Sequence, residues 1–205
     1  MRLNALFPSF VYQAALSKAQ AEALNSKIIA EGLQLREDDE AGRRWSAKNY
    51  RHGYTSYGSV HRLHEISPTF AELKERLDPH VKRFARTLFW DLKGRRLEMT
   101  DCWLNIMGQS SRHGLHLHPS ASVSGTYYAK TPKGSPGLKF EDPRLERFMA
   151  APPRKASAPR HLKPWMTFDA RAGHLLLFES WLRHEVVANP VTALRVSVSF
   201  NYHWF

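Results

Sequence analysis

The histidines of this chain are concentrated in one short segment that could hold a metal ion. Residues 112–119 read RHGLHLHP and include His113, His116 and His118. Side chains two residues apart share one face of a β-strand, so His116 and His118 could present two imidazoles to one ion. Unrelated surface histidines can have the same spacing. A metal site at this segment therefore requires a third ligand from another part of the chain.

The segment 173–184, with the sequence GHLLLFESWLRH, contains a candidate for that ligand. A glycine turn at Gly173 leads into an apolar strand, and a short loop then brings His184 to the start of the next strand. In a jelly roll, this arrangement delivers a distal ligand to the mouth of the barrel. His184 is therefore a candidate for the missing ligand.

The last predicted strand, 193–204, carries an arginine beside a hydroxyl group. Its side chains alternate between polar and apolar, so the strand is either half-solvated or lines a polar cavity inside a barrel. The alternation fits both readings. Arg195 and Ser197 are neighbours on the polar face and could anchor a carboxylate through paired hydrogen bonds. The polar face carries Arg195, Ser197, Ser199, Asn201 and His203, and the apolar face carries Val196, Val198, Phe200, Tyr202 and Trp204.

The elements that would position these residues are mostly short strands. After Gly94 the apolar period changes from 3.6 to 2. Many short strands with helices gathered on the N-terminal side predict a mainly β (α+β) fold. We expect a double-stranded β-helix, or jelly roll, with N-terminal helices packed on its outer face. The predicted strands are 97–107, 123–130, 138–140, 166–168, 175–178, 185–187 and 193–204.

The first part of the chain predicts a strand, a helix and a long loop. Residues 1–16 indicate a short strand that buries apolar side chains. Apolar spacing predicts an amphipathic helix over 17–31, which Gly32 would end. The polar stretch 36–59, with scattered aromatic residues, indicates a long loop with little regular structure.

A second helix is expected to begin at the capping box Thr69–Glu72 and to run towards Trp90. Pro79 should kink or split this helix, because proline removes a backbone donor and clashes with the preceding turn. The segment 91–94 should close it.

One connection within the predicted core is long and basic. Residues 142–163 are rich in proline, alanine and arginine, and connections of this length are usually lids or disordered inserts. We expect a lid that closes over an anionic substrate or over an acidic stretch of a macromolecule. Its positive charge comes from Arg144, Arg147, Arg154, Lys155, Arg160 and Lys163.

Length and composition fit one domain over 1–205, with the cover in 1–94 and the jelly-roll core in 95–205. Lys and Arg number 30 against 19 Asp and Glu, a net charge of +11, but they never form a long basic run. No apolar run is long enough to cross a bilayer, and the first residues lack a secretory pattern. The single cysteine, Cys102, excludes an intrachain disulfide, so we expect a cytoplasmic protein.

Several ordered motifs occur in the second half of the chain. They are Trp103–Ile106 (WLNI), His116–Pro119 (HLHP), Ser124–Tyr128 (SGTYY), Asp142–Arg144 (DPR), Leu177–His184 (LFESWLRH) and Arg195–Asn201 (RVSVSFN). In this order they resemble an uncharacterised bacterial and phage branch of the 2-oxoglutarate- and Fe(II)-dependent dioxygenases. The likeness is strong over 100–205 and looser over the opening Leu-Phe-Pro and the helix at 70–90.

The resemblance implies an enzyme that uses Fe(II) and 2-oxoglutarate. Such an enzyme decarboxylates 2-oxoglutarate to succinate while it hydroxylates or otherwise oxidises a substrate, which is unknown here. No catalytic residue beyond the metal centre is implied. By position, His116 would be the first metal ligand and His184 the distal one, and Arg195 with Ser197 would hold the far carboxylate of 2-oxoglutarate. Further candidates are Asn105 and Tyr127 for the co-substrate, and Tyr128, Trp181 and Arg144 for the substrate.

The chain departs from the family pattern at His118, which stands where a carboxylate ligand is usual. Three neutral imidazoles would leave Fe(II) with its full +2 charge, which alters its redox potential and oxygen binding. Either this branch uses the three histidines, or a carboxylate such as Asp142 takes part, or the metal is not a dioxygenase iron.

Two other readings remain open from the sequence. A cupin-type metal protein tolerates three histidines, although the glutamate usual after its His-x-His is missing; Arg195 with Ser197 would discriminate, because a cupin does not need them. A non-catalytic module could bind RNA or another polyanion through the basic insert and aromatics such as Trp45 and Tyr50. We favour an enzyme acting on a small molecule or a macromolecule, with no membrane partner, because no RNA-binding motif is present.

Overall fold

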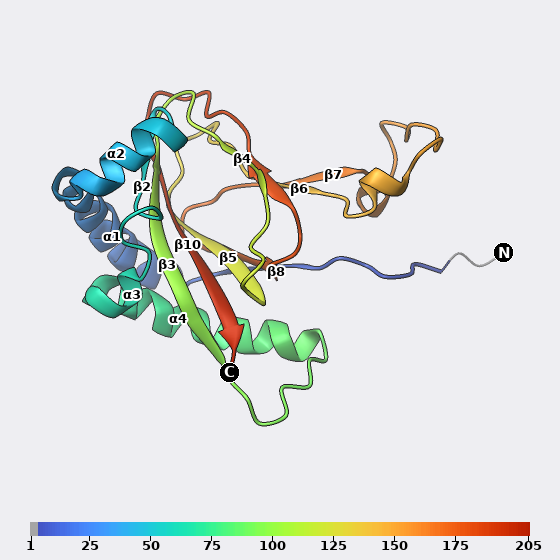
Figure 1. Cartoon of the computed structure of the whole chain (residues 1–205), viewed down its shortest axis with the longest axis horizontal. Coiled ribbons are helices and arrows are strands. Elements are labelled where there is room, and N and C mark those ends of the chain that lie inside the picture. Colours follow the sequence, from blue (N-terminus) through green and yellow to red (C-terminus); the bar gives the residue numbers. More distant parts are fainter. Residues whose placement is uncertain (1–3) are drawn as a thin grey trace.

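Two antiparallel sheets form the body of the molecule. The structure is a computed structural model and describes residues 4–205. Within these residues a six-stranded and a four-stranded sheet form a jelly roll, which confirms the predicted fold (Figure 1). In spatial order the larger sheet contains β1 (Val11–Ala15), β8 (His174–Glu179), β5 (Val123–Lys130), β10 (Arg195–Trp204), β3 (Leu97–Met107) and β2 (Gly53–Thr55). The smaller sheet contains β4 (His113–His116), β9 (His184–Val186), β6 (Leu138–Glu141) and β7 (Trp165–Phe168).

Strand β10 separates the hydrophobic core from an internal cavity. It pairs along its length with β3 on one side and with β5 on the other. Its apolar face is buried beneath the helices, and its polar face lines a cavity between the two sheets, so the cavity-lining reading of its alternation is correct. The core-facing residues are Val196, Val198, Phe200 and Tyr202, and the cavity-facing residues include Arg195, Ser197 and Ser199.

The helices cover the outer face of the larger sheet, as predicted (Figure 1). They are α1 (Lys18–Asp38), α2 (Glu40–Asn49), α3 (Leu63–Ile66) and α4 (Pro68–Thr87). Leu24 and Ile28 of α1 and Phe70 of α4 are almost completely buried against the sheet residues Leu104 and Val198. Burying a side chain of this kind contributes roughly 1.5–3 kcal/mol, so this layer holds the cover in place.

The strand expected within residues 1–16 forms, but it is short. Only Val11–Ala15 pair with β8, and Leu6, Phe7 and Phe10 remain exposed rather than buried. The first three residues of the predicted segment lie outside the described part of the chain.

The prediction that Gly32 ends the first helix is wrong, because Gly32 lies within α1. A Cβ atom at this position would come within 2.7 Å of Leu104 Cδ2 on β3. The glycine therefore allows α1 to approach the sheet closely, and the helix continues to Asp38.

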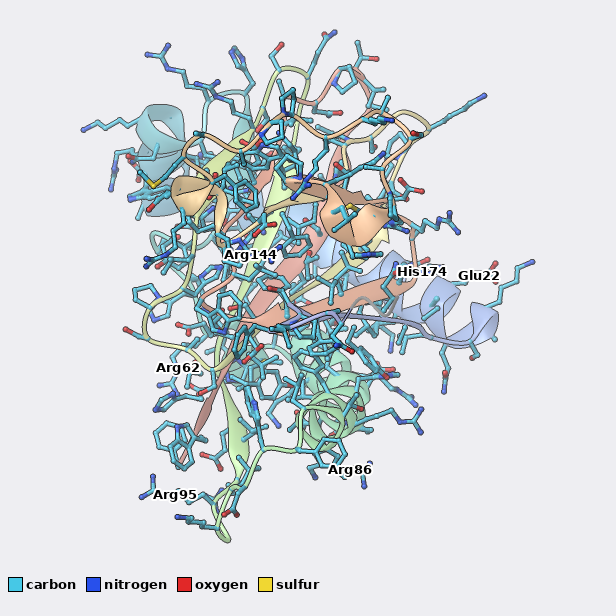
Figure 2. The ribbon with its side chains drawn as sticks, turned by 90° about the vertical axis from the view of Figure 1, so that its right-hand side faces the viewer. Glu22, Arg62, Arg86, Arg95, Arg144 and His174 are labelled. Carbon is cyan, nitrogen blue, oxygen red and sulfur yellow. The ribbon has the colours of Figure 1, made fainter. Side chains whose placement is uncertain are left out.

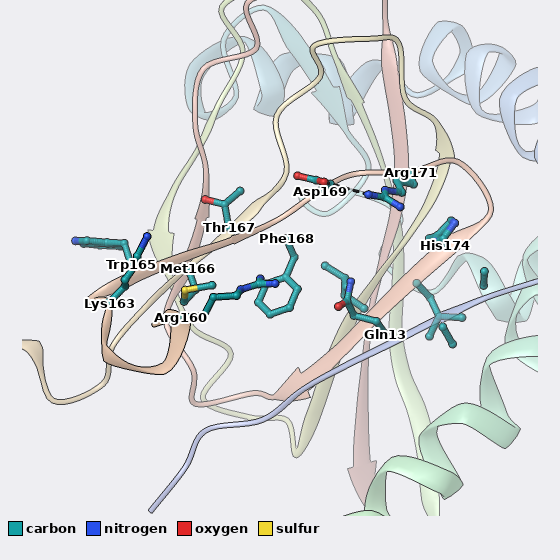
Figure 3. Close-up of a pocket in the computed structure, with 14 residues that line it drawn as sticks. Gln13, Arg160, Lys163, Trp165, Met166, Thr167, Phe168, Asp169, Arg171 and His174 are labelled. Carbon is teal, nitrogen blue, oxygen red and sulfur yellow. Dashed lines mark hydrogen bonds and ion pairs between the residues drawn. The ribbon is translucent and has the colours of Figure 1, made fainter. Parts of the chain in front are cut away.

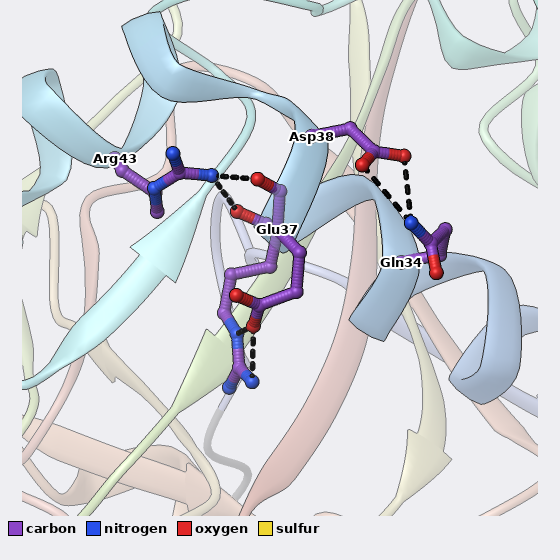
Figure 4. A network of polar contacts seen from close by, with 5 residues as sticks. Gln34, Glu37, Asp38 and Arg43 are labelled. Carbon is purple, nitrogen blue, oxygen red and sulfur yellow. Dashed lines mark hydrogen bonds and ion pairs between the residues drawn. The ribbon is translucent and has the colours of Figure 1, made fainter.

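The stretch 36–59 is not a long loop, because α2 and β2 form within it. Figure 4 shows the contacts that hold α2 against the end of α1: the Arg43 guanidinium donates to the backbone oxygens of Arg36, at 2.8 Å, and of Glu37. Asp39 caps the new helix by accepting from the Gly42 N–H at 2.8 Å. These contacts involve polar side chains, so an apolar periodicity does not reveal this helix.

Helix α4 also differs from its prediction. Its N-cap is Ser67, two residues before the predicted Thr69, and the Ser67 hydroxyl accepts from the Phe70 N–H. The helix runs through Pro79 without splitting. Its apolar residues on both sides of the proline, including Leu77 and Val81, are buried against the sheet. Tertiary packing therefore compensates for the backbone hydrogen bond that Pro79 cannot donate.

The basic insert 142–163 is the long end of the β6–β7 hairpin. The Asp142 N–H donates to the Pro164 oxygen at 2.7 Å and closes its base, and the segment beyond contains only short 3₁₀ turns, Leu145–Arg147 and Arg160–Leu162. In Figure 1 it projects away from the sheets.

The positive charge of the surface is dispersed. Figure 2 places Arg62, Arg86, Arg95 and Arg144 at separate positions on the molecule. Over residues 4–205, the helices include none with the length and apolar character needed to cross a membrane.

The junction of α1 and α2 should depend on Asp39. Its carboxylate accepts hydrogen bonds from the Gly42 N–H and the Tyr54 hydroxyl, both at 2.8 Å, and from Ser59. We expect Asp39→Ala to lower the free energy of unfolding by about 1–3 kcal/mol, measured by urea denaturation. Its exposed neighbour is the control, and Asp38→Ala should change stability by less than about 0.5 kcal/mol.

The contribution of Asp39 to the free energy of unfolding should depend on pH. Burial alone would raise the pKa of Asp39, but the hydrogen bonds from Ser59, Gly42 and Tyr54 outweigh it and hold the pKa below its ordinary value. Such a group stabilises the fold above its unfolded pKa and loses that contribution as the pH falls through its folded pKa. Equal loss of stability in the Asp38 and Asp39 variants would contradict the assignment.

Candidate metal centre and co-substrate cavity

Three histidines meet where β4 ends and β9 begins. His116 and His184 are directly paired across these two antiparallel strands, and His118 follows two residues beyond the end of β4. One ring nitrogen from each lies within 4.8 Å of the others. In residues 4–205 no other group of three histidine, cysteine or acidic side chains converges in this way.

Backbone carbonyls orient two of the three imidazoles. His184 Nδ1 lies 2.9 Å from the Leu182 oxygen, and His116 Nδ1 lies 2.7 Å from the Gly114 oxygen. A carbonyl oxygen only accepts hydrogen bonds, so both Nδ1 atoms must carry protons. Each Nε2 is then left with a free lone pair, which is the form that a metal-ligating histidine requires.

The surroundings of His118 and His184 favour their neutral imidazole forms. Burial, with a contribution from neighbouring charges, lowers the pKa of His184 to about 3 and that of His118 to about 4. His116 is exposed and His184 is buried, so the triad extends from the interior to the mouth of the cavity. The three nitrogens fit a divalent transition metal such as Fe(II), which imidazole ligands suit.

Over residues 4–205, no carboxylate joins the triad. Asp142, the alternative considered from the sequence, is bound by Arg144 through two side-chain hydrogen bonds of 2.8 and 3.0 Å. This pair lies at the base of the β6–β7 hairpin and does not line the cavity. The structure therefore brings His118 together with His116 and His184, the two ligands that the resemblance implied, and not Asp142.

A polar chain supports the backbone beneath His118. The Asn201 amide donates to Asp101 at 3.2 Å, and the Ser124 hydroxyl donates to Asn201 at 2.8 Å. A 2.8 Å hydrogen bond joins the Ser124 and Ser180 hydroxyls, and the Ser180 carbonyl accepts from the His118 N–H at 3.0 Å. The motifs around Ser124, Ser180 and Asn201 thus meet in one network that positions a ligand.

A buried arginine lines the same cavity as the triad. Arg195 is only 2% exposed, and it donates to the Ser197 hydroxyl at 3.1 Å. Its guanidinium carbon lies 5.1 Å from the centre of the Tyr128 ring. Among the described residues no carboxylate lies within ion-pair distance of Arg195. A buried cation without an anionic partner is costly, so this position is suited to an anionic ligand.

Other buried polar atoms around Arg195 also lack protein partners. They include the Tyr50 hydroxyl, the Tyr128 hydroxyl and Arg195 Nε. Burial raises the pKa of both tyrosines to about 12, so the hydroxyls remain donors. The cavity has a volume of about 480 Å³. The tyrosine hydroxyls and the Arg195 guanidinium could donate hydrogen bonds to the carboxylate group of a small co-substrate.

The structure divides the remaining sequence candidates into two groups. Asn105 lines the cavity and donates to Ser199 at 3.0 Å. Tyr127, by contrast, points to the opposite face of the sheet, where its hydroxyl donates to Asn25 of α1 at 2.8 Å. The reason is strand parity, because neighbouring residues of β5 face opposite sides. Its neighbour Tyr128 therefore takes the position beside Arg195.

The three substrate candidates do not line this cavity. Tyr128 contacts the co-substrate end, Arg144 lies on the β6–β7 hairpin, and Trp181 is half-exposed outside the cavity. Sequence reasoning missed one cavity residue. Tyr50, expected to be an exposed aromatic, is buried and stacks on His113 with ring centres 4.2 Å apart. No spacing signal in the segment around Tyr50 indicates this.

In this structure the insert does not line the cavity, and the lid hypothesis stays a prediction. Arg160 and Lys163, near its end, line a different groove of about 810 Å³ (Figure 3). This edge groove lies between the outer strands β1 and β7, where Arg171 pairs with Asp169 at 3.3 Å. The insert is therefore connected to the edge of the sandwich and not to the metal centre.

The fold and the cavity together fit the class of non-haem, 2-oxoglutarate-dependent metal oxygenases. The family model described as "Putative 2OG-Fe(II) oxygenase" matches residues 101–201. This region of the chain therefore belongs to the 2OG-Fe(II) oxygenase family, which confirms the resemblance of its motifs. No protein of curated function matches the sequence.

Solved structures share the fold at low sequence identity. The α-ketoglutarate-dependent epimerase SnoN from nogalamycin biosynthesis has a TM-score of 0.66 at 15% identity, covering 96% of this chain and 79% of its own. HygX from Streptomyces hygroscopicus, with nickel and 2-oxoglutarate bound, has a TM-score of 0.63 at 14% identity, covering 96% and 83%. A Pseudomonas putida prolyl-4-hydroxylase has a TM-score of 0.56 at 15% identity, covering 95% and 92%.

Arg195 should cost stability in the absence of a ligand and should mediate stabilisation by 2-oxoglutarate. We expect Arg195→Met to be at least as stable as the wild type without 2-oxoglutarate, because the variant removes a buried, unpaired charge. With Fe(II) under anaerobic conditions, 2-oxoglutarate at 100 times its Kd should stabilise the wild type by about 2.7 kcal/mol, raising its Tm by a few degrees.

Adding 2-oxoglutarate with Fe(II) should leave the Tm of Arg195→Met nearly unchanged. Arg171→Met, which removes an exposed arginine from the edge groove, is the matched control and should retain the full increase. An unaltered 2-oxoglutarate response in Arg195→Met would show that the co-substrate binds elsewhere.

Proposed function

We propose that this protein is a 2-oxoglutarate- and Fe(II)-dependent oxygenase that oxidises a C–H bond of an organic substrate and converts 2-oxoglutarate to succinate. The observation that carries the proposal is the pairing of two features in one cavity. Three imidazoles that could bind one metal ion line a cavity of about 480 Å³. The same cavity is lined by a buried arginine that, among the described residues, pairs with no carboxylate. The family match over residues 101–201 supports it.

Each side chain of the cavity has a role in this function. His116, His118 and His184 hold the metal, which when bound supplies the oxygen-activating chemistry. Arg195 and Ser197 bind the far carboxylate of 2-oxoglutarate. The hydrogen bonds of His116 and His184 to backbone oxygens would keep their rings oriented for metal binding.

Apolar side chains shield the interior of the cavity from water. Leu138, Phe178 and Val186 are buried parts of its wall. Excluding water from this end strengthens the charge-assisted hydrogen bonds of Arg195 and protects reactive species from side reactions.

The mouth of the cavity is aromatic and open. Trp45 and Tyr57 are partly exposed, and Tyr57 packs on Trp103 with ring centres 5.1 Å apart. A substrate can reach the metal centre between these rings and β4. HygX has been solved with hygromycin B bound, and a prolyl hydroxylase of Trichoplax adhaerens with a peptide fragment. We propose a small molecule as the substrate of this chain, because the cavity is of the size that holds one.

The cupin alternative is less well supported than an oxygenase. A cupin-type metal site would account for the three histidines but not for Arg195. The buried guanidinium of Arg195 next to Ser197 has no partner of opposite charge within the described part of the chain. The polyanion-binding alternative is weakened by the burial of Tyr50 and by the dispersed basic residues. A cytoplasmic location remains our prediction, and the buried free thiol of Cys102 agrees with it.

An anaerobic titration tests the proposed function. Fe(II) added with 2-oxoglutarate should produce the weak visible charge-transfer band of the chelate in the wild type and not in His116→Ala or His184→Ala. Arg195→Ala should retain the metal but bind 2-oxoglutarate at least tenfold more weakly, because a charge-assisted pair contributes about 1.5–3 kcal/mol. His174→Ala, outside the cavity on β8, is the control and should behave as the wild type.

Metal binding without the band would favour a cupin-like protein. A band that survives both histidine substitutions would refute the proposed ligand set. Succinate formation from 2-oxoglutarate in air, measured without added substrate, gives an independent readout of the same chemistry.

A further inference from the structure

A second groove adjoins the metal centre on the outer side of His118. It has a volume of about 410 Å³, and Leu117 and His118 belong to its wall as well as to that of the cavity. We call it the tryptophan groove, because three indoles line it: Trp90, Trp181 and Trp204. A molecule in this groove is therefore adjacent to the candidate metal site.

Three separate parts of the chain build the tryptophan groove. Trp90 follows the end of α4, Trp181 lies in the loop between β8 and β9, and Trp204 ends β10. Trp181 is 46% exposed and Trp204 is 38% exposed. Large aromatic side chains gathered at a hollowed surface mark a binding site more often than scattered ones do.

The groove is acidic although the chain as a whole is basic. Asp91 and Glu179 line it, and within residues 4–205 no lysine or arginine does. Among the described residues neither carboxylate forms an ion pair; Asp91 accepts only the Lys93 N–H, at 3.1 Å. This negative lining contrasts with the net charge of +11, and it would repel the anionic substrate that the basic insert led us to expect.

Indole faces and carboxylates attract the same kind of ligand. The face of an aromatic ring carries partial negative charge, so it binds ammonium and guanidinium groups, and tryptophan does so best. The chain itself shows this property at Trp204, because the Arg95 guanidinium carbon lies 4.5 Å from the centre of its ring. Arg95 does not line the groove, so it does not occupy it.

We propose that the tryptophan groove binds the ammonium group of a small-molecule substrate, a protonated or methylated amine, while the rest of the substrate extends past Leu117 towards the metal centre. This inference rests on the proposed oxygenase function. Trp181 and Glu179 then determine specificity, which gives Trp181 a role in substrate binding outside the cavity.

Two probes of equal shape test the charge requirement. Choline carries a quaternary ammonium group, and 3,3-dimethylbutan-1-ol is its neutral counterpart. Tryptophan fluorescence and saturation-transfer NMR should show saturable binding of choline to the wild-type protein in the low millimolar range. We expect the neutral alcohol to bind about tenfold more weakly, because a cation–π contact in a partly desolvated site contributes about 1–2 kcal/mol.

Two substitutions locate the binding site. Trp181→Ala and the nearly isosteric Glu179→Gln should each weaken choline binding about threefold to tenfold. Trp165→Ala is the matched control, because Trp165 also contacts a cation but lies in the edge groove. The Lys139 Nζ atom is 4.1 Å from the centre of the Trp165 ring. Circular dichroism checks that each variant is folded. If Trp181→Ala does not fold, Glu179→Gln still tests the groove.

The outcomes separate this inference from the proposed function. Equal binding of both probes, no binding of choline up to about 100 mM, or an equal effect of Trp165→Ala and Trp181→Ala would overturn the ammonium site. The Fe(II)–2-oxoglutarate band is recorded on the same samples. A band without choline binding refutes the groove and leaves the oxygenase intact, whereas choline binding without the band supports an ammonium site and refutes the oxygenase.

Discussion

The antiparallel pairing of β10 between β3 and β5 is the constraint on which the rest of the structure depends. Because side chains alternate across a strand, one register decides both what enters the core and what enters the cavity. Val198 and Phe200 hold the helices on one side, and Arg195 and Ser197 face the co-substrate space on the other. A shift by one residue would place the arginine in the core, so folding and function share one requirement.

The metal centre depends on a second pairing, between β4 and β9. This pairing sets His116 opposite His184, and backbone oxygens then select the nitrogen that each ring presents. The cavity contains imidazoles and one buried guanidinium, and within residues 4–205 no acidic group lies in ion-pair distance of Arg195. Both the metal end and the arginine end therefore favour a ligand that brings negative charge, as a dicarboxylate does.

Sequence reasoning located the parts of the site that depend on local spacing. His116, His118 and His184 could be selected because their chemistry and strand positions are visible in the chain, and Arg195 because the alternation around it is regular. Tyr127 and Tyr128 are neighbours on β5 and therefore face opposite sides of the sheet. The sequence does not show which of the two faces the cavity. Helix α2, Tyr50 and the tryptophan groove arise from contacts between distant segments, for which a single sequence carries no periodic signal.

The β6–β7 hairpin shows where this architecture has freedom to diverge. Its base is closed by a backbone hydrogen bond at Asp142, and its long end contributes nothing to the walls of the cavity. Insertions and deletions beyond that base leave the pairing of β9 with β4 unchanged. In evolutionary terms the hairpin can change its length and charge rapidly while the histidines stay in register, so relatives with the same chemistry can present very different surfaces at this edge.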